Sequence, residues 1–216
     1  MIRKIKNLVW AFLRKINLGG PIQLMLTGAL IEDGWYKSFN TKTSVDKKGE
    51  PIPWCTYSFI KFIEPRLKKT FNVFEYGCGN STIWYAKRVN SIKAIEHNQN
   101  WRNTISMELP SNAYVYFKEF SINGDYAKAI LNEENEFNII VIDGIDRNNC
   151  LKYSLRKITS DGIIVFDNSE REEYNESYPI LESAGFRRVD FWGLGPIVNI
   201  NSCTSIFYRI NNCIGI

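Results

Sequence analysis

Two acids and a glycine turn, all between residues 72 and 96, are the part of this sequence that best indicates chemistry. An apolar run ends in Glu75, a turn with Gly77 and Gly79 follows, and a second apolar run ends in Glu96. Because glycine has no side chain, its backbone can approach a ligand closely. A carboxylate at the tip of the second strand can accept hydrogen bonds from both hydroxyls of a ribose. The spacing therefore predicts a nucleoside site in a strand–helix–strand unit.

The residues around the turn indicate which nucleoside is bound. A dinucleotide-binding turn has a third glycine, but this sequence has Thr82 at that position. It also has an acid, Glu75, two residues before the first glycine. This E-x-G-x-G pattern resembles motif I of the class I methyltransferases, which use S-adenosylmethionine (SAM). The resemblance implies SAM as the cofactor, and since SAM has no pyrophosphate, a third glycine is not required.

The same resemblance implies a set of cofactor contacts. Glu75 and the two glycines are expected at the methionine end of SAM, Glu96 at the ribose and His97 beside the adenine. Asp125, after the third predicted strand, is a candidate for contact with the adenine amine; a role as a helix N-cap is the alternative. The full set of predicted cofactor-binding residues is Glu75, Gly77, Gly79, Ser81, Glu96, His97, Asp125 and Asp143.

The composition is that of a single globular domain. With 216 residues, 44% hydrophobic and 23% charged, the chain can bury a core of ordinary size. Five scattered cysteines without a C-x-x-C pair, and one histidine, argue against a zinc cluster. Unpaired cysteines and the lack of a secretory signal lead us to expect a cytoplasmic location.

The net charge of +4 is concentrated at the N-terminus. Residues 1–20 contain five basic residues and no acid, so the rest of the chain has 22 basic and 23 acidic residues, a net charge of −1. Nucleic-acid-binding proteins usually have a basic surface on their body. The near-neutral body therefore argues against a nucleic-acid partner.

Residues 2–18 are predicted to form a basic amphipathic helix that ends at Gly19-Gly20-Pro21. Apolar residues recur at helical spacing on one face, and the basic residues lie largely opposite. Charges interrupt the segment too often for it to span a bilayer. Two interpretations remain open. The helix packs on the domain or on a second subunit of a homo-oligomer, as most amphipathic helices do, or it makes peripheral contact with the inner face of an anionic membrane.

These patterns divide the chain into the N-terminal helix at 1–20, a lid or cap at 21–66 and a methyltransferase domain at 67–216. The middle segment is rich in aromatic residues, among them Trp35 and Trp54. Two roles are open for it: covering the cofactor or acceptor, or packing against the edge of the sheet.

Apolar runs alternate with helical segments over the rest of the chain, which predicts a Rossmann-like, doubly wound α/β sheet. The run 137–142 (FNIIVI) is almost wholly apolar, as expected of a central parallel strand that is buried on both faces. We expect seven strands, the last one antiparallel, with an N-terminal helical extension. The predicted strands are 73–76, 92–95, 113–118, 137–142, 162–166, 186–192 and 204–208.

Three oxygen-bearing side chains follow the fourth and fifth predicted strands: Asp143, Asp167 and Asn168. The carboxyl ends of parallel strands meet at one edge of the sheet, and Mg²⁺ prefers carboxylate, amide and water oxygens. The arrangement resembles the metal site of catechol O-methyltransferase-like and macrolide-sugar O-methyltransferases. In those families the metal binds two adjacent hydroxyls of the acceptor and lowers the pKa of the one to be methylated. A polar strand terminus is the structural alternative.

Those enzymes have a lysine or histidine base soon after the aspartate of strand four, and this sequence has neither. The window reads DGIDR, so Asp143 and Asp146 are the candidate catalytic residues. An ordinary carboxylate is a weak base for a sugar hydroxyl. Three alternatives remain: a metal supplies the activation, Asp146 has a raised pKa, or the base lies elsewhere.

Longer segments between residues 34 and 210 resemble the small methyltransferases of bacterial polysaccharide and cell-surface gene clusters. They are PW and TY within 53–57, FEYGCGNST, IEHNQNW, VIDGIDR, and GIIVFDNSER with Tyr174. The resemblance implies methyl transfer from SAM to a hydroxyl of a sugar or another small acceptor. Acceptor loops vary too much to identify the acceptor. The alternatives are a SAM-binding scaffold without catalysis and a nicotinamide-dependent oxidoreductase.

Overall fold

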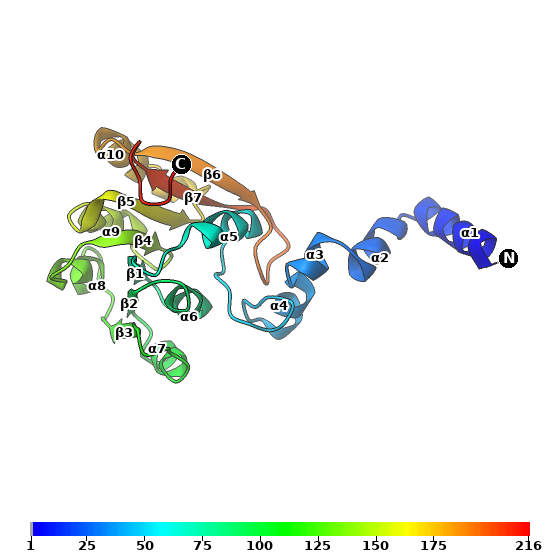
Figure 1. The fold of residues 1–216 in the computed structure, drawn as a ribbon, viewed down its shortest axis with the longest axis horizontal. Helices are drawn as coiled ribbons and strands as arrows, with labels where there is room; N and C mark the ends of the chain where they lie inside the picture. Colours follow the sequence, from blue (N-terminus) through cyan, green and yellow to red (C-terminus); the bar gives the residue numbers. More distant parts are fainter. Residues whose placement is uncertain (1) are drawn as a thin grey trace.

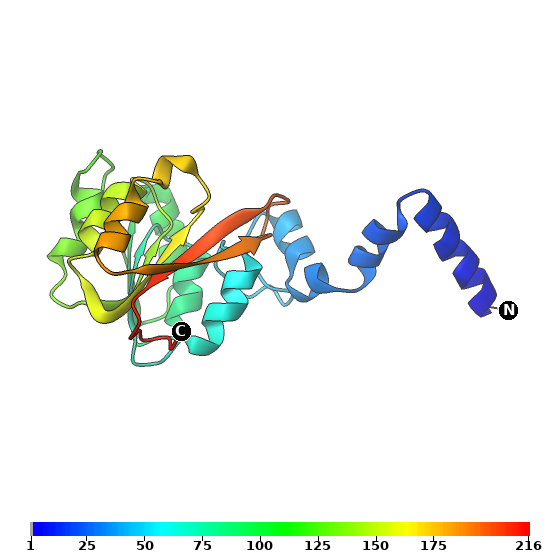
Figure 2. The same ribbon diagram turned by 90° about the horizontal axis from the view of Figure 1, so that it is seen from above.

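The computed structural model describes residues 2–216, which form one seven-stranded sheet with helices around it (Figures 1 and 2). The strands are β1 (Asn72–Tyr76), β2 (Ser91–Glu96), β3 (Ala113–Phe117), β4 (Phe137–Ile142), β5 (Ile158–Asp167), β6 (Arg187–Gly193) and β7 (Ser202–Tyr208). The α-helices are α1 (Ile2–Lys15), α2 (Gly19–Leu26), α3 (Ala29–Glu32), α4 (Trp35–Thr41), α5 (Tyr57–Ile63), α6 (Asn80–Ala86), α7 (Gln99–Ser106), α8 (Asp125–Lys128), α9 (Arg147–Ser154) and α10 (Ser177–Ser183). Short 3₁₀ helices are η1 (Glu64–Arg66), η2 (Ala129–Asn132) and η3 (Glu172–Tyr174).

The strands lie in the order β3-β2-β1-β4-β5-β7-β6. The first five strands along the chain pair in parallel, and β7 runs antiparallel to both β5 and β6. This confirms the predicted fold class, including the antiparallel last strand and the N-terminal helices. In this order β1 lies between β2 and β4, so the tips of these three strands are neighbours.

Helices cover both faces of the sheet, because successive side chains of a strand point to opposite sides (Figure 2). Val73 is buried in the same cluster as residues of α5 and α6, whereas Phe74 is buried with residues of α8, α9 and α10. Val141 and Ile142 of the central strand β4 divide in the same way. The core therefore consists of two apolar layers, one on each side of the sheet.

The N-terminal helix is shorter than predicted, and its predicted stop is wrong. α1 ends at Lys15, after which Asn17 takes a left-handed conformation with φ 58°. The N–H of Leu18 then donates to the carbonyl of Leu13 (2.9 Å), which caps the last turn. Gly19, expected to follow the end of the helix, is the first residue of α2.

The segment before β1 has two different parts. α1 and α2 project away from the sheet, and no residue of α1 is buried (Figure 1). α5 belongs to the core, since Phe59 and Ile63 are fully buried. The end of segment 21–66 therefore packs against the sheet, while the division at residues 20 and 66 stays a prediction. No helix within 2–216 is long and apolar enough to cross a bilayer.

The tips of β1 and β4 approach each other at two glycines. A Cβ on Gly144 would lie 2.0 Å from the hydroxyl oxygen of Tyr126 and 2.9 Å from the backbone nitrogen of Gly77. The space at Gly144 therefore excludes any side chain.

Gly144→Ala should lower the free energy of unfolding by about 1–3 kcal/mol, because a methyl group there forces its neighbours apart. Gly20→Ala is the matched control, since a Cβ on Gly20 would have no neighbour within 4 Å. In helix α2 that change should leave stability unchanged or raise it by up to about 1 kcal/mol. Urea unfolding followed by circular dichroism measures both, and equal stability of the two variants would contradict the close contact.

Candidate active site

Glu96 ties the glycine turn after β1 to the tip of β2. Its Oε2 accepts a hydrogen bond from the N–H of Cys78 (3.2 Å), and its Oε1 accepts from the N–H groups of His97 and Asn98 (2.8 Å each). Nδ1 of His97 lies 3.0 Å from the same Oε1. Glu96 is only 4% exposed, so its carboxylate is held in one position beside the turn.

Glu75, in β1, is buried and is held from the start of α6. The hydroxyl of Thr82 donates to Oε2 of Glu75 (2.5 Å) and accepts from the N–H of Gly79 (3.1 Å). Burial raises the pKa of Glu75 to about 7, although hydrogen bonds from Ser81 and Thr82 oppose this rise. Thr82, which stands where a dinucleotide turn has its third glycine, therefore caps the helix and positions the acid.

A cavity of about 230 Å³ opens between the tips of β1, β2 and β4. Its lining residues are Glu75, Gly77, Cys78, Ser81, Glu96, His97, Asp143, Gly144 and Ile145. It thus brings together most of the residues predicted to bind the cofactor. The volume is below the roughly 300–1,000 Å³ of most small-molecule pockets, so a whole nucleoside cofactor would extend beyond it. A larger cavity of about 450 Å³ lies beside β2 and β3 and has none of the predicted residues in its lining.

Among the residues predicted for cofactor binding and catalysis, three do not line the smaller cavity: Gly79, Asp125 and Asp146. The N–H of Gly79 serves the start of α6, and Asp125 is exposed at the start of α8. The carboxylate of Asp146 accepts hydrogen bonds from the N–H of Asn123 and from Nδ2 of Asn149 (2.8 Å each), which joins the loop before α8 to α9. The predicted roles of these three residues in binding and catalysis stay predictions.

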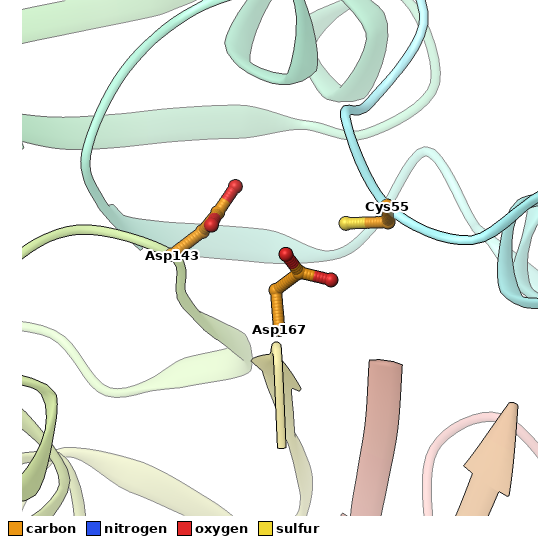
Figure 3. A group of neighbouring side chains, drawn as sticks. All are labelled: Cys55, Asp143 and Asp167. Atoms are coloured by element: carbon orange, nitrogen blue, oxygen red, sulfur yellow. The ribbon is translucent and has the colours of Figure 1, made fainter. Parts of the chain in front are cut away.

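Asp143, which follows β4, lies beside Asp167, the last residue of β5. Cys55, in the loop before α5, completes a cluster of three side chains. Figure 3 shows the three side chains pointing toward one another, and one ligand atom of each lies within 4.8 Å of the others. Cys55 was not predicted, because no spacing in the sequence relates it to the two strands. Asn168, which follows Asp167, is half-buried and has a left-handed backbone (φ 50°).

Arg147 balances the charge of this cluster from the first turn of α9. Its Nη2 donates to Oδ1 of Asp143 (3.1 Å), its Nε to the carbonyl of Gly144 (2.8 Å) and its Nη1 to the carbonyl of Asp167. The guanidinium is buried, with Arg147 only 7% exposed. Burial raises the pKa of Asp143 and of Asp167, while the charge of Arg147 opposes this rise at both. The pair therefore takes up a proton more readily than ordinary carboxylates do.

Solved structures share this arrangement of elements, whereas no family model and no curated protein matches the sequence. A precorrin-6y C5,15-methyltransferase from Geobacter metallireducens is 14% identical, with 79% of this chain and 96% of that chain covered and a TM-score of 0.57. An rRNA methylase from Streptococcus thermophilus is 13% identical, with 69% and 93% covered and a TM-score of 0.54. The chain has the class I methyltransferase fold. At these identities the likeness concerns the fold alone.

Within this methyltransferase fold, the contacts of the acid cluster give the predicted Mg²⁺ site no support. Arg147 donates to one oxygen of Asp143, and the hydroxyl of Thr204 donates to Oδ1 of Asp167 (2.6 Å). The third group is the thiol of Cys55, whose pKa is raised first by burial and then by the two carboxylates, so it stays protonated. Mg²⁺ prefers a near-octahedral shell of oxygen atoms, whereas a thiol suits softer metals.

A second residue that the sequence did not reveal is Tyr85 of α6. Its hydroxyl is buried and has no hydrogen-bond partner among residues 2–216. Burial raises its pKa, and the negative charges of Glu75 and Asp143 raise it further, so the hydroxyl stays protonated. Because a buried hydroxyl without a partner is costly, Tyr85 is a donor ready for a water or a ligand oxygen beside the acids.

The burial of Glu75 predicts how stability depends on pH. Its carboxyl has a pKa of about 7 in the folded chain, against 4.5 for the ordinary side chain. The stability from this group is therefore complete below the ordinary value and is lost as the pH rises through about 7. Glu75→Gln removes this loss. Relative to wild type, the free energy of unfolding of the variant should improve by about 3 kcal/mol between about pH 4.5 and pH 8.

Urea unfolding over this pH range measures the difference. Glu108→Gln, at an exposed position, is the control and should follow the wild-type curve throughout. Parallel pH curves for Glu75→Gln and wild type would show that the acid at the end of β1 is not destabilised by its burial.

Proposed function

We propose that this protein is a SAM-dependent methyltransferase that methylates a hydroxyl group of a sugar or another small acceptor. The observation that carries the proposal is the position of Glu96. Three backbone N–H groups hold its carboxylate beside the glycine turn, in a cavity that Glu75 also lines. A fixed acid at this place can select a ribose, and an acid at the first strand can bind an ammonium group.

The contacts of each cavity residue suit one part of the cofactor. Among residues 2–216, Oε2 of Glu96 accepts one N–H, so it retains capacity for a ribose hydroxyl. His97 lines the cavity with its ring edge-to-face against Tyr126, 5.9 Å between ring centres, which offers a flat surface for the adenine. The buried carboxyl of Glu75 would bind the amino group of SAM, and a cation there favours its ionised form.

When bound, SAM supplies an electrophilic methyl group. Asp143 lines the same cavity, and its raised pKa makes it a better base than an ordinary carboxylate. We assign it the uptake of the acceptor's hydroxyl proton. Asp146 is engaged in two hydrogen bonds that hold the loop before α8, so it serves as a positioning residue. The main contribution of the chain is to align the acceptor oxygen with the methyl group.

Bacterial cell-surface saccharides and their precursors are the acceptor class that we favour. The support is the set of segments, FEYGCGNST through GIIVFDNSER, that resemble methyltransferases of polysaccharide gene clusters. We further propose that Arg147, rather than Mg²⁺, balances the charge of Asp143 and Asp167 during the reaction.

Glu96→Ala should weaken SAM binding at least about tenfold, because the variant loses the acceptor for the ribose hydroxyls. Isothermal titration calorimetry measures the affinity, and circular dichroism checks that the variant is folded. Glu119→Ala, at an exposed position after β3, is the control and should bind SAM as wild type does. Absence of SAM binding by the folded wild type, or binding of NADH in its place, would overturn the proposal.

Magnesium should not bind to the wild-type protein at the Asp143–Asp167 pair, even with SAM present. Arg147→Met removes the donor to Oδ1 of Asp143 and the positive charge that balances both acids, so this variant should gain affinity for Mg²⁺. Calorimetric titration with MgCl₂ compares the two proteins, and methyl transfer by wild type should be equal in EDTA and in millimolar MgCl₂. Wild-type Mg²⁺ binding that Asp167→Asn abolishes would instead support the metal site predicted from the sequence.

A further inference from the structure

α1 presents an uncovered apolar stripe to solvent. Ile2, Ile5, Leu8 and Phe12 are 84%, 55%, 70% and 61% exposed, and their spacing places them on one face of the helix. Figures 1 and 2 both show α1 projecting away from the sheet and the helices that cover it. No other part of the described chain, residues 2–216, buries this stripe.

The rest of the α1 surface is basic. Residues 1–31 contain five basic residues and no acid: Arg3, Lys4, Lys6, Arg14 and Lys15. At about 100° per residue, Lys6 and Lys15 border the apolar stripe on its two sides, and Trp10 lies next to Lys6. Such bordering lysines can reach anionic groups at a surface into which the apolar residues insert.

Helices α1 and α2 together form an N-terminal arm, residues 2–26, and the connection between them is well defined. The capped end of α1 leads directly into α2, and Gly19 lies so close to α1 that a Cβ on it would be 3.3 Å from the backbone nitrogen of Arg14. α2 exposes further apolar side chains, since Leu24, Met25 and Leu26 are 45%, 64% and 63% exposed. The apolar surface therefore continues from α1 into α2.

We propose that residues 2–26 bind the surface of an anionic lipid bilayer, with the apolar stripe inserted at the headgroup boundary. Charge complementarity favours this occupant. A second copy of the chain would add five more positive charges, whereas anionic lipids supply the opposite charge. α1 is about 21 Å long at 1.5 Å per residue, and the hydrocarbon core is about 30 Å thick, so the helix lies on the bilayer.

The arm leaves the body at the edge of the sheet that carries the acids. Nε1 of Trp35, the first residue of α4, donates to the carbonyl of Val198 (2.7 Å) in the loop between β6 and β7. β6 runs in the same direction as β5, since both are antiparallel to β7, so this loop begins at the edge where Asp167 lies. Trp54 and Trp192 are 51% and 57% exposed near this edge, and tryptophan favours membrane interfaces.

This placement identifies a class of acceptor, if the proposed methyl transfer is correct. A body held by its arm at the bilayer has the edge that carries the acids near the lipid headgroups. The acceptor is then a hydroxylated compound attached to the membrane, such as a lipid-linked saccharide, rather than a free sugar.

Vesicle sedimentation with two variants of the full chain tests the proposal. Wild type should sediment with vesicles of phosphatidylcholine and phosphatidylglycerol, and much less with phosphatidylcholine alone. Phe12→Glu puts a negative charge on the stripe and should weaken binding at least about tenfold. Ala11→Glu makes the same charge change on the exposed polar face and should cost only about threefold.

The proposal is overturned if wild type does not bind the anionic vesicles, or if Phe12→Glu binds as well as wild type. A wild-type dimer without lipid that Phe12→Glu converts to a monomer would show instead that the stripe is a contact between copies. SAM titration separates this idea from the proposed function, because Phe12→Glu should bind SAM as wild type does. Vesicle binding by a protein that binds no SAM would refute the function and leave the membrane contact standing.

Discussion

The structure of the site depends on how acids are held at the carboxyl ends of buried parallel strands. Removing a carboxylate from water is costly unless hydrogen bonds or an opposite charge replace the water. At the end of each strand, a different kind of partner replaces the water around the acid. Glu96 has backbone N–H groups, Glu75 has the hydroxyls of α6, and Asp143 has the guanidinium of Arg147. These partners fix where each acid points, and hence which part of a ligand it can contact.

The strand order brings these three acids together in one site. Because β1 lies between β2 and β4, the glycine turn after β1 borders both Glu96 and Asp143. Gly77 and Gly144 lie against each other, which brings the two strand tips as close as backbone atoms allow. A side chain at either glycine would separate the acids proposed to bind the nucleoside from Asp143, the acid proposed to act on the acceptor.

The sequence predicted well what depends on local pattern. Alternating apolar runs predicted the sheet, and the glycine turn together with the acids at the ends of those runs and their neighbours predicted six of the nine residues that line the cavity. The stop of α1 was wrong because Asn17 supplies the left-handed residue that glycine usually provides, while Pro21 is tolerated in the first turn of α2. Cys55 and Tyr85 were missed because only the folded chain brings them to the acids. The contact between Arg147 and Asp143 could have been predicted from the sequence, since the two residues are four positions apart.

Charge balance by Arg147, in place of a metal ion, changes how the acid cluster could activate an acceptor hydroxyl. A magnesium ion has open coordination positions and can bind two acceptor hydroxyls directly, which lowers their pKa. The guanidinium of Arg147 is already occupied by three oxygen atoms of the chain and stays in place. In the proposed reaction it would balance charge without contacting the acceptor. Activation of the hydroxyl would then come from an acid with a raised pKa, and burial raises the pKa of Asp143 and of Asp167. The burial that destabilises their ionised forms would therefore suit these acids to accept a proton in the proposed methyl transfer.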